Sequence, residues 1–305
     1  MKFLERTFQL TKGVGPWRER DLWARELATW TDFEAAAARG VVMNDRLDRE
    51  LLEAIAKTRD ALNRKSLAEL ATLVPVKEHW RLYGHFLEDA AFFDIEADGE
   101  HVPTVVGVMD RQGVATFRRG HSMKELPARL AKSPIWVTFN GSVFDVPALE
   151  KAFETLLPLP NAGEGWGEGI TFPKPLVHLD LRFLIRHAKL KGGLKGVEDA
   201  IGLARPPHLK GVRGLDAIRL WREWTINGEL GALRLLTEYN LYDAINLRSV
   251  LEWTLWKVAD LNTWSVVREP IFERGDVLYD VSRLVLALED EPSVAARRRR
   301  QEGHG

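Results

Sequence analysis

The feature that most constrains this chain is a pair of carboxylates set inside an apolar run. Asp94 and Glu96 follow directly on the apolar residues 90–93 (AAFF), a composition typical of a buried central strand. Residues two apart in a strand project from the same face, so the two acids would lie side by side while Ile95 points into the core. We therefore expect a sheet that carries two neighbouring carboxylates on one face.

This pair of acids predicts a metal site. Two carboxylates at this spacing repel each other in an apolar strand unless a cation or a proton intervenes. The chain has no cysteine, which excludes disulfides and thiolate sites, so any metal is held by oxygen or histidine. Oxygen ligands favour Mg²⁺ or Mn²⁺ over Zn²⁺. Acid-x-acid triplets also occur on solvated surfaces, but the apolar flank of Asp94 and Glu96 favours a divalent cation.

A second group of polar residues lies at the end of another expected strand, residues 135–139. Asn140 and Asp145 follow this strand, where loops commonly assemble active sites in α/β folds. Asn140 is a candidate substrate-binding residue. Asp145 also suits the N-cap of the helix expected over residues 145–156, a purely structural role. The sequence leaves both interpretations of Asp145 open.

A third pair lies in a long helix expected over residues 229–259. Tyr239 and Asp243 are four residues apart and therefore share one face of that helix. A tyrosine packed in the core beside a surface acid is the ordinary explanation of such a pair. Its position after the sheet and after a basic segment favours a functional role.

The basic segment spans residues 182–222. It contains ten Lys or Arg against three acids, whereas the formal net charge of the whole chain is −1. Such clusters bind phosphate backbones, although a solvated helix face is the usual explanation of a charge run. Lys195, which follows Gly192 and Gly193, is a candidate phosphate ligand, with a solvated lysine as the equal alternative.

Apolar periodicity and turn residues indicate a mixed sheet covered by helices. The first three strands are separated by turn-forming Asp98-Gly99 and Gln112-Gly113 and should form an antiparallel meander. Asp180, at the end of a strand, is expected to cap the helix after it, with support of the metal ligands as the alternative. The expected strands are residues 90–96, 104–109, 114–117, 135–139 and 177–180. The expected helices around them are residues 122–131, 145–156, 182–190, 194–202, 215–226 and 229–259.

The N-terminal region is expected to be helical. A first helix would carry four apolar residues on one stripe, and residues 34–86 have helical patterning throughout. Ser66 with Glu69 three residues later forms a capping-box pattern that starts a helix. The apolar stripe of the first helix consists of Leu22, Trp23, Leu27 and Trp30.

Together the acidic and tyrosine motifs resemble the DEDD superfamily of metal-dependent 3′→5′ exonucleases, in its tyrosine variant. The three motifs of that superfamily occur here in order, as Asp94-x-Glu96, Asn140-x(3)-Phe144-Asp145 and Tyr239-x(3)-Asp243. Further stretches look more particularly like the bacterial YprB-type ribonuclease H-like domain, namely His178-Leu-Asp180-Leu, Gly193-Leu-Lys195 and residues 240–247. The resemblance covers residues 88–260.

The resemblance implies a ribonuclease H-like fold, in which a mixed sheet is flanked by helices, and two divalent cations, Mg²⁺ or Mn²⁺. It implies that Asp94 bridges both metals and that Glu96 and Asp243 complete one of the two sites. Asp145 would support the other site, often through water, and Tyr239 would position the attacking water. The implied reaction is hydrolysis of phosphodiester bonds from the 3′ end of a nucleic acid.

Three regions are expected along the chain. Residues 1–87 form a helical N-terminal region, in which Lys12-Gly13-Val14-Gly15 resembles a helix-hairpin-helix element that binds DNA phosphates. A plain tight turn is the equal alternative for that element. Residues 88–260 form the ribonuclease H-like exonuclease domain, and residues 261–305 form a C-terminal extension with a basic tail.

Two segments are expected to lack regular structure. The proline- and glycine-rich stretch 158–175 should be a mobile loop, and Trp166 within it is a candidate base-stacking residue. The tail carries Arg297 to Arg300 and should fray, with a minor possibility of nucleic-acid contact.

The sequence also suggests a compartment and leaves alternatives. The N-terminus lacks the apolar core of a secretory signal, and no uncharged run approaches the roughly 18 residues that span a bilayer. We expect a cytoplasmic protein that binds nucleic acid and has no membrane segment. A ribonuclease H-like endonuclease and a non-catalytic nucleic-acid-binding protein with the same fold stay open as alternatives. Nothing in the sequence decides between DNA and RNA.

Overall fold

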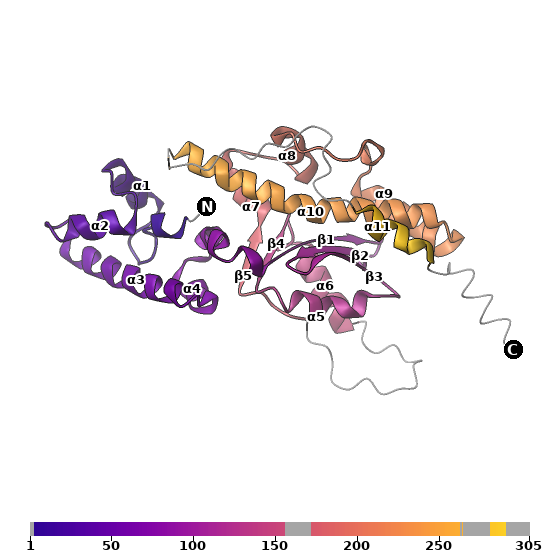
Figure 1. The fold of residues 1–305 in the computed structure, drawn as a ribbon, viewed down its shortest axis with the longest axis horizontal. Helices are drawn as coiled ribbons and strands as arrows, with labels where there is room; N and C mark the ends of the chain where they lie inside the picture. The colour runs from indigo at the N-terminus through magenta and orange to yellow at the C-terminus, as the bar shows by residue number, and fades with distance from the viewer. Residues whose placement is uncertain (1–2, 156–171, 263, 265–280, 291–305) are drawn as a thin grey trace, which may run out of the picture. The chain divides into compact units, whose positions relative to one another are not determined.

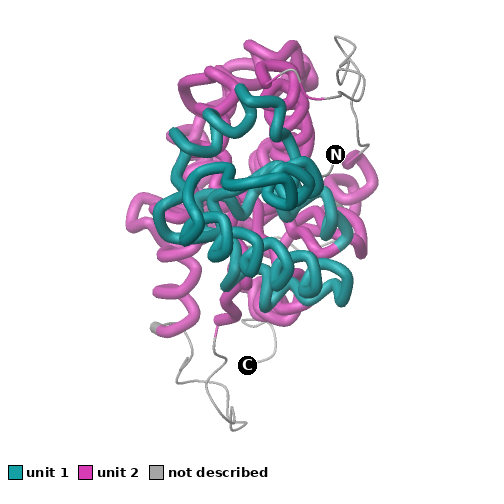
Figure 2. Tube along the Cα trace, turned by 90° about the vertical axis from the view of Figure 1, so that its left-hand side faces the viewer, with its two compact units in different colours: residues 1–88 teal, residues 89–305 magenta. Residues whose placement is uncertain are grey.

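The structure is a computed structural model that describes residues 3–155, 172–262, 264 and 281–290. The chain divides into two compact units, residues 1–88 and residues 89–305, which Figure 2 shows in different colours. Most of the predicted glycine-rich loop, with Trp166, and the predicted basic tail lie outside the described residues.

The first unit is helical. Gly13, with a left-handed φ of 99°, lies in the predicted turn before the first α-helix. Whether this turn binds DNA stays a prediction. The elements up to residue 89 are η1 (Leu4–Arg6), α1 (Pro16–Ala24), α2 (Trp30–Ala37), α3 (Asp45–Asn63), α4 (Leu67–Leu73), and the 3-10 helices η2 (Val76–His85) and η3 (Leu87–Asp89).

The single helix predicted to carry both Leu22 and Trp30 is wrong. α1 ends before Glu26, which adopts a left-handed backbone with φ 64°. A reciprocal capping box between Thr29 and Asp32 then starts α2. These side-chain bonds satisfy the backbone donors of a new helix start, so the local signal outweighs the continuous apolar period.

The capping box predicted at Ser66 and Glu69 is also wrong, although α4 does begin directly after Ser66. The Ser66 hydroxyl makes no bond to the backbone of the helix and donates instead to Glu69 Oε1 at 3.1 Å. Both oxygens of Glu69 accept from the guanidinium of Arg64, at 2.6 and 2.7 Å. This bidentate pair takes the carboxylate that the capping box would have used.

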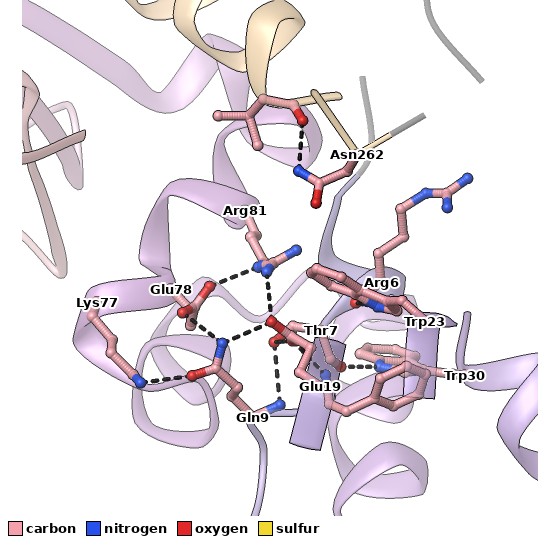
Figure 3. Close-up of polar contacts among 12 residues, drawn as sticks. Arg6, Thr7, Gln9, Glu19, Trp23, Trp30, Lys77, Glu78, Arg81 and Asn262 are labelled. Carbon is pink, nitrogen blue, oxygen red and sulfur yellow. Dashed lines mark hydrogen bonds and ion pairs between the residues drawn. The ribbon is translucent and has the colours of Figure 1, made fainter. Parts of the chain in front are cut away.

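A buried polar network joins the N-terminal segment, α1 and η2 (Figure 3). Glu19, which is 3% exposed, accepts hydrogen bonds from Thr7 Oγ1 at 2.7 Å and Gln9 Nε2 at 2.8 Å. Arg81 donates to Glu19 at 3.3 Å and, through Nε, to Glu78 at 2.8 Å. Because each buried carboxylate has a cationic partner and further donors, these charges are accommodated inside the unit.

The second unit is built on one five-stranded mixed sheet. Its strands are β1 (Ala90–Ala97), β2 (Pro103–Asp110), β3 (Gly113–Arg118), β4 (Ile135–Thr138) and β5 (Val177–Asp180). The strand order is β3-β2-β1-β4-β5, in which β1, β2 and β3 form the predicted antiparallel meander. β1 pairs parallel with β4, and β4 pairs parallel with β5. The predicted fold class, a mixed sheet flanked by helices, is confirmed.

Helices cover both faces of this sheet (Figure 1). α5 (Leu126–Leu130) and α6 (Asp145–Thr155) pack on one face, and α9 (Gly214–Arg222) and α10 (Leu230–Leu261) pack on the other. Within the described residues, no helix combines the length and the apolar character that crossing a membrane requires. The remaining elements are η4 (Met123–Glu125), α7 (Leu181–Leu184), η5 (Ile185–Ala188), α8 (Leu194–Ile201), η6 (Pro207–Leu209), the π-helical turn η7 (Glu223–Asn227), α11 (Ser282–Leu286) and η8 (Ala287–Asp290).

The side chains of β1 alternate between the two faces, as the sequence predicts. Phe93 and Ile95 are buried in the core on the α6 side. Asp94 and Glu96 project to the opposite face, which α10 covers. The central strand of the sheet therefore presents two carboxylates to the long helix.

Candidate metal centre

Three carboxylates from distant parts of the chain meet between β1 and α10. Asp94 and Glu96 project from β1, and Asp243 projects from α10. One oxygen of each lies within 4.8 Å of the oxygens of the other two. Three oxygen donors at this spacing can hold one metal ion.

Gly107 lets α10 lie close enough to the sheet for this arrangement. This glycine of β2 pairs with Asp94 of β1. A Cβ at position 107 would lie 2.9 Å from Asn240 Oδ1 and 3.3 Å from the Cβ of Ala244, both on α10. A larger residue would therefore push the helix, and Asp243 with it, away from β1.

Asn240 orients Asp94. Its Nδ2 donates to the main-chain oxygen of Asp94 and to Asp94 Oδ2, each at 3.0 Å. Sequence reasoning missed this role, because the two residues are 146 positions apart and no local spacing relates them. The available hints were its position between Tyr239 and Asp243 and its place in the YprB-like stretch of residues 240–247.

Asp145 lies beside the cluster at the start of α6. It is the first residue of that helix, one position after the N-cap that the sequence offered as an alternative, and its role as a metal ligand stays a prediction. The pairing of β1 with β4 ends at Phe92 and Val137. Past that point, Asp145 Oδ1 accepts a hydrogen bond from the main-chain N–H of Ile95 at 3.2 Å. The carboxylate thus takes the place of a strand partner next to Asp94 and Glu96.

The loop from Asn140 to Asp145 is held by Asp180. Asp180 accepts from the main-chain N–H groups of Asn140, at 2.7 Å, and Ser142, at 3.1 Å, and it caps α7 as predicted. Asn140 has a left-handed φ of 68°, and a Cβ on Gly141 would lie 2.3 Å from the Thr138 side chain. This tight turn sets where α6, and hence Asp145, begins.

The Asn140 side chain contacts a cationic residue of α7. Its Oδ1 accepts a hydrogen bond from Arg182 Nη1 at 2.5 Å. A role for Asn140 in substrate binding stays a prediction.

Lys195 contacts the acidic cluster directly, and its role as a phosphate ligand stays a prediction. Its ammonium donates to both oxygens of Asp243, at 2.7 and 3.0 Å, and to the hydroxyl of Tyr239. The same nitrogen lies 4.1 Å from the centroid of the Tyr239 ring. Lys195 is therefore a direct counter-ion of the acidic cluster.

Arg205 also reaches Asp243, and Glu198 holds Arg205 in place; sequence reasoning had counted both residues only in the local charge balance. Arg205 forms an ion pair with Asp243 Oδ1 and a second, bidentate one with Glu198. Glu198 is three residues after Lys195 on α8, and no motif marked either residue.

Three acids at this site have raised pKa values in the absence of a cation. Burial, together with the charges of Asp243 and Asp145, raises the pKa of Asp94 well above its ordinary value. Burial and the charge of Asp243 raise the pKa of Glu96 to about 8, and burial raises the pKa of Asp145 to about 7. A divalent ion would replace protons on these acids, and the all-oxygen donor set fits a hard ion such as Mg²⁺ or Mn²⁺.

A comparison of the sequence with known protein families finds one family that covers this site. The family described as the RNase_H superfamily (RNase_H_2) matches residues 91–255, more than half of the chain. The chain belongs to the RNase H superfamily. None of the curated proteins matches it. The matched span of this RNase H superfamily domain contains Asp94, Glu96, Asp145, Tyr239 and Asp243.

Membership in the RNase H superfamily carries a functional meaning. A domain of this superfamily suggests a nuclease-type function and implies a nucleic-acid substrate. Nucleases of this kind generally use divalent metals, and the cluster of Asp94, Glu96 and Asp243 could bind one. The finer resemblance, to tyrosine-type DEDD exonucleases and to the YprB type, stays a prediction.

Proposed function

We propose that this protein is a metal-dependent 3′→5′ exonuclease that hydrolyses phosphodiester bonds of DNA or RNA. The observation that carries the proposal is the meeting of Asp94, Glu96 and Asp243 inside an RNase H superfamily domain. Buried carboxylates that repel each other next to a polyanionic substrate are costly, and a cation site is the function that offsets this cost.

The carboxylates would hold two divalent cations, Mg²⁺ or Mn²⁺. Asp94, Glu96 and Asp243 offer the donors of one site, and Asp145, which the backbone of Ile95 fixes beside β1, would support a second. The chemistry that such ions supply is a lowered pKa of water and stabilisation of the leaving oxygen. The protein's contribution is to keep the four carboxylates in place.

Tyr239 would orient the attacking water as a neutral phenol. Burial and the charges of Asp243, Glu96 and Asp94 raise the pKa of its hydroxyl, so it keeps its proton at neutral pH. A neutral hydroxyl can donate one hydrogen bond and accept others, which suits positioning rather than proton abstraction. In the DEDD resemblance a tyrosine at this position accompanies terminal processing, which supports the exonuclease over an endonuclease.

The substrate would be bound next to the cluster by cationic and amide groups. Lys195, with 41% of its side chain exposed, can turn from Asp243 to a phosphate. Asn140 lies on the loop that leads to Asp145, and its partner Arg182 lies on α7; both are candidates for a second phosphate or sugar contact.

The test uses the purified full-length protein with Mn²⁺ and oligonucleotides of DNA and RNA labelled at the 5′ end, single-stranded and duplex. A 3′→5′ exonuclease shortens them in single-nucleotide steps, and Asp94→Ala abolishes the ladder. A circular single strand is the control. Cleavage of the circle would instead establish an endonuclease, and binding without cleavage would establish a non-catalytic protein.

A further inference from the structure

The orientation of the Asp243 carboxylate needs an explanation. This side chain is 5% exposed and faces two other acids, Asp94 and Glu96, whose charges repel it. Its two rotatable bonds would let it turn away from them. Two cations, Lys195 and Arg205, contact it, and they are held in different ways.

Arg205 is fixed by a second carboxylate. Its Nε donates to Glu198 Oε2 at 2.7 Å, and its Nη2 donates to Glu198 Oε1 at 2.6 Å. The Arg205 side chain is 9% exposed and that of Glu198 is 2% exposed. A buried bidentate pair of this kind restricts a guanidinium to one plane, from which Nη2 also reaches Asp243.

The pair is tied back to the helix that carries Asp243. Asn246, three residues after Asp243 on α10, donates from Nδ2 to Glu198 Oε1 at 2.9 Å. Asp243 thus contacts the arginine, and Asn246 the glutamate, of the same Glu198–Arg205 pair. The result is a closed ring of polar contacts between α8, the residues that follow it, and one turn of α10.

The Lys195 side chain has fewer contacts than that of Arg205. With 41% of its side chain exposed, its ammonium contacts only Asp243 and Tyr239 among the described residues. A lysine on a flexible stem can leave when a cation or a phosphate arrives, whereas the ring around Arg205 cannot open without exposing buried charges.

Stability alone is a poor reason to keep such a ring. Buried ion pairs contribute little to stability compared with apolar residues of the same volume, and where they are kept they can specify one geometry. We infer that Glu198 and Arg205 are positioning residues, which hold Asp243 in the orientation that meets Asp94 and Glu96. This inference rests on the proposed function, in which Asp243 is a metal ligand.

The test removes both charges of the pair at once. The double variant Glu198→Gln/Arg205→Met keeps the net charge, but of the two residues only Arg205 contacts Asp243. The change in potential alone would therefore favour a bound cation, so weaker metal binding reports a displaced carboxylate. Mn²⁺ titration of the full-length protein by calorimetry should show binding weakened about 10- to 100-fold. Asn246→Ala, which changes no charge, should weaken it in the same direction by less.

The matched control is the buried pair of Glu78 and Arg81 in the first unit. Its side chains are 5% and 3% exposed, and the two residues are of the same types as Glu198 and Arg205. Glu78→Gln/Arg81→Met should lower the melting temperature in EDTA to a similar degree but leave the Mn²⁺ affinity within about twofold of wild type.

The outcomes separate the inference from the proposed function. A wild-type protein that binds no Mn²⁺ overturns both. A wild type that binds Mn²⁺, with site variants that bind it equally well, overturns only the positioning role and makes Glu198 and Arg205 purely structural. If the double variant fails to fold, Asn246→Ala decides by the same criterion.

Discussion

A single carboxamide on α10 bonds twice to one residue of β1: Asn240 Nδ2 lies 3.0 Å from the main-chain oxygen of Asp94 and 3.0 Å from its Oδ2. The same contact therefore docks the helix on the central strand and aims a carboxylate. Because Asp243 follows three residues later on that helix, the acidic cluster exists only when α10 is seated on the sheet. Metal affinity should accordingly report on tertiary packing.

Asn240→Ala should weaken Mn²⁺ binding about tenfold, because it frees the Asp94 side chain from its only described amide donor. Unfolding by urea in EDTA should show a loss of about 1–2 kcal/mol, since two partly buried hydrogen bonds disappear. The control is Asn227→Ala, which removes an exposed contact to Glu223 on η7. Unchanged Mn²⁺ affinity in Asn240→Ala would contradict the orienting role.

Gly107→Ala should move α10 away from β2. The new methyl group would lie 2.9 Å from Asn240 Oδ1, so the helix must shift at a cost of about 1–3 kcal/mol. We expect a lower melting temperature and weaker Mn²⁺ binding together. Gly99→Ala is the matched control, since it lies in the turn between β1 and β2 with open space around its Cβ. Equal behaviour of the two variants would argue against close packing at Gly107.

The strand β1 and the residues that contact its carboxylates show what the sequence could and could not predict. The apolar run before Asp94 and the alternation around Ile95 are local, so they predicted the strand, its two faces and the paired carboxylates. The partners of those carboxylates are not local. Asn240 and Arg205 reach the cluster only because α8 and α10 fold over the sheet, and no spacing in the sequence relates them to β1.

The wrong predictions have the same origin at a smaller scale. Apolar residues continued at helical spacing through Trp30, but the polar pair of Thr29 and Asp32 decided where a helix starts. At Glu69 a nearby arginine took the carboxylate that the capping pattern assigned to the backbone. In each case a polar contact outweighed a pattern that counted only spacing.

The pH dependence of stability should depend on metal. Glu96 has a pKa of about 8 in the folded protein, above its ordinary value of 4.5, so the folded state binds more protons than the unfolded state between these values. Without metal, this group makes stability fall as pH rises from about 5 to about 8. Saturating Mg²⁺ should remove the fall by replacing the protons.

Melting temperatures in EDTA and in Mg²⁺, from pH 5 to 8, test this for wild type and Glu96→Gln. The other groups with shifted pKa values remain in both proteins: Asp94 and Asp145, whose pKa is raised, and His178, whose pKa burial lowers and which contributes with the opposite sign. The difference between wild type and variant therefore reports Glu96 together with its effect on the pKa of Asp94. Wild type should lose stability relative to Glu96→Gln as pH rises in EDTA. A difference that stays constant across this range would show that Glu96 does not titrate there.

Lys195→Met should change metal binding and catalysis in opposite directions. The ammonium lies 2.7 Å from Asp243 Oδ2, where it competes with an incoming cation. Its removal should tighten Mn²⁺ binding roughly two- to fivefold, the effect of a half-exposed ion pair. The rate of single-turnover cleavage at saturating Mn²⁺ should nevertheless fall, because the phosphate loses a cationic partner.

Lys191→Met, which changes an exposed lysine four residues earlier, is the control and should alter neither the Mn²⁺ affinity nor the cleavage rate. If Lys195→Met weakens Mn²⁺ binding as well, the lysine helps to assemble the Asp243 site instead of competing for it.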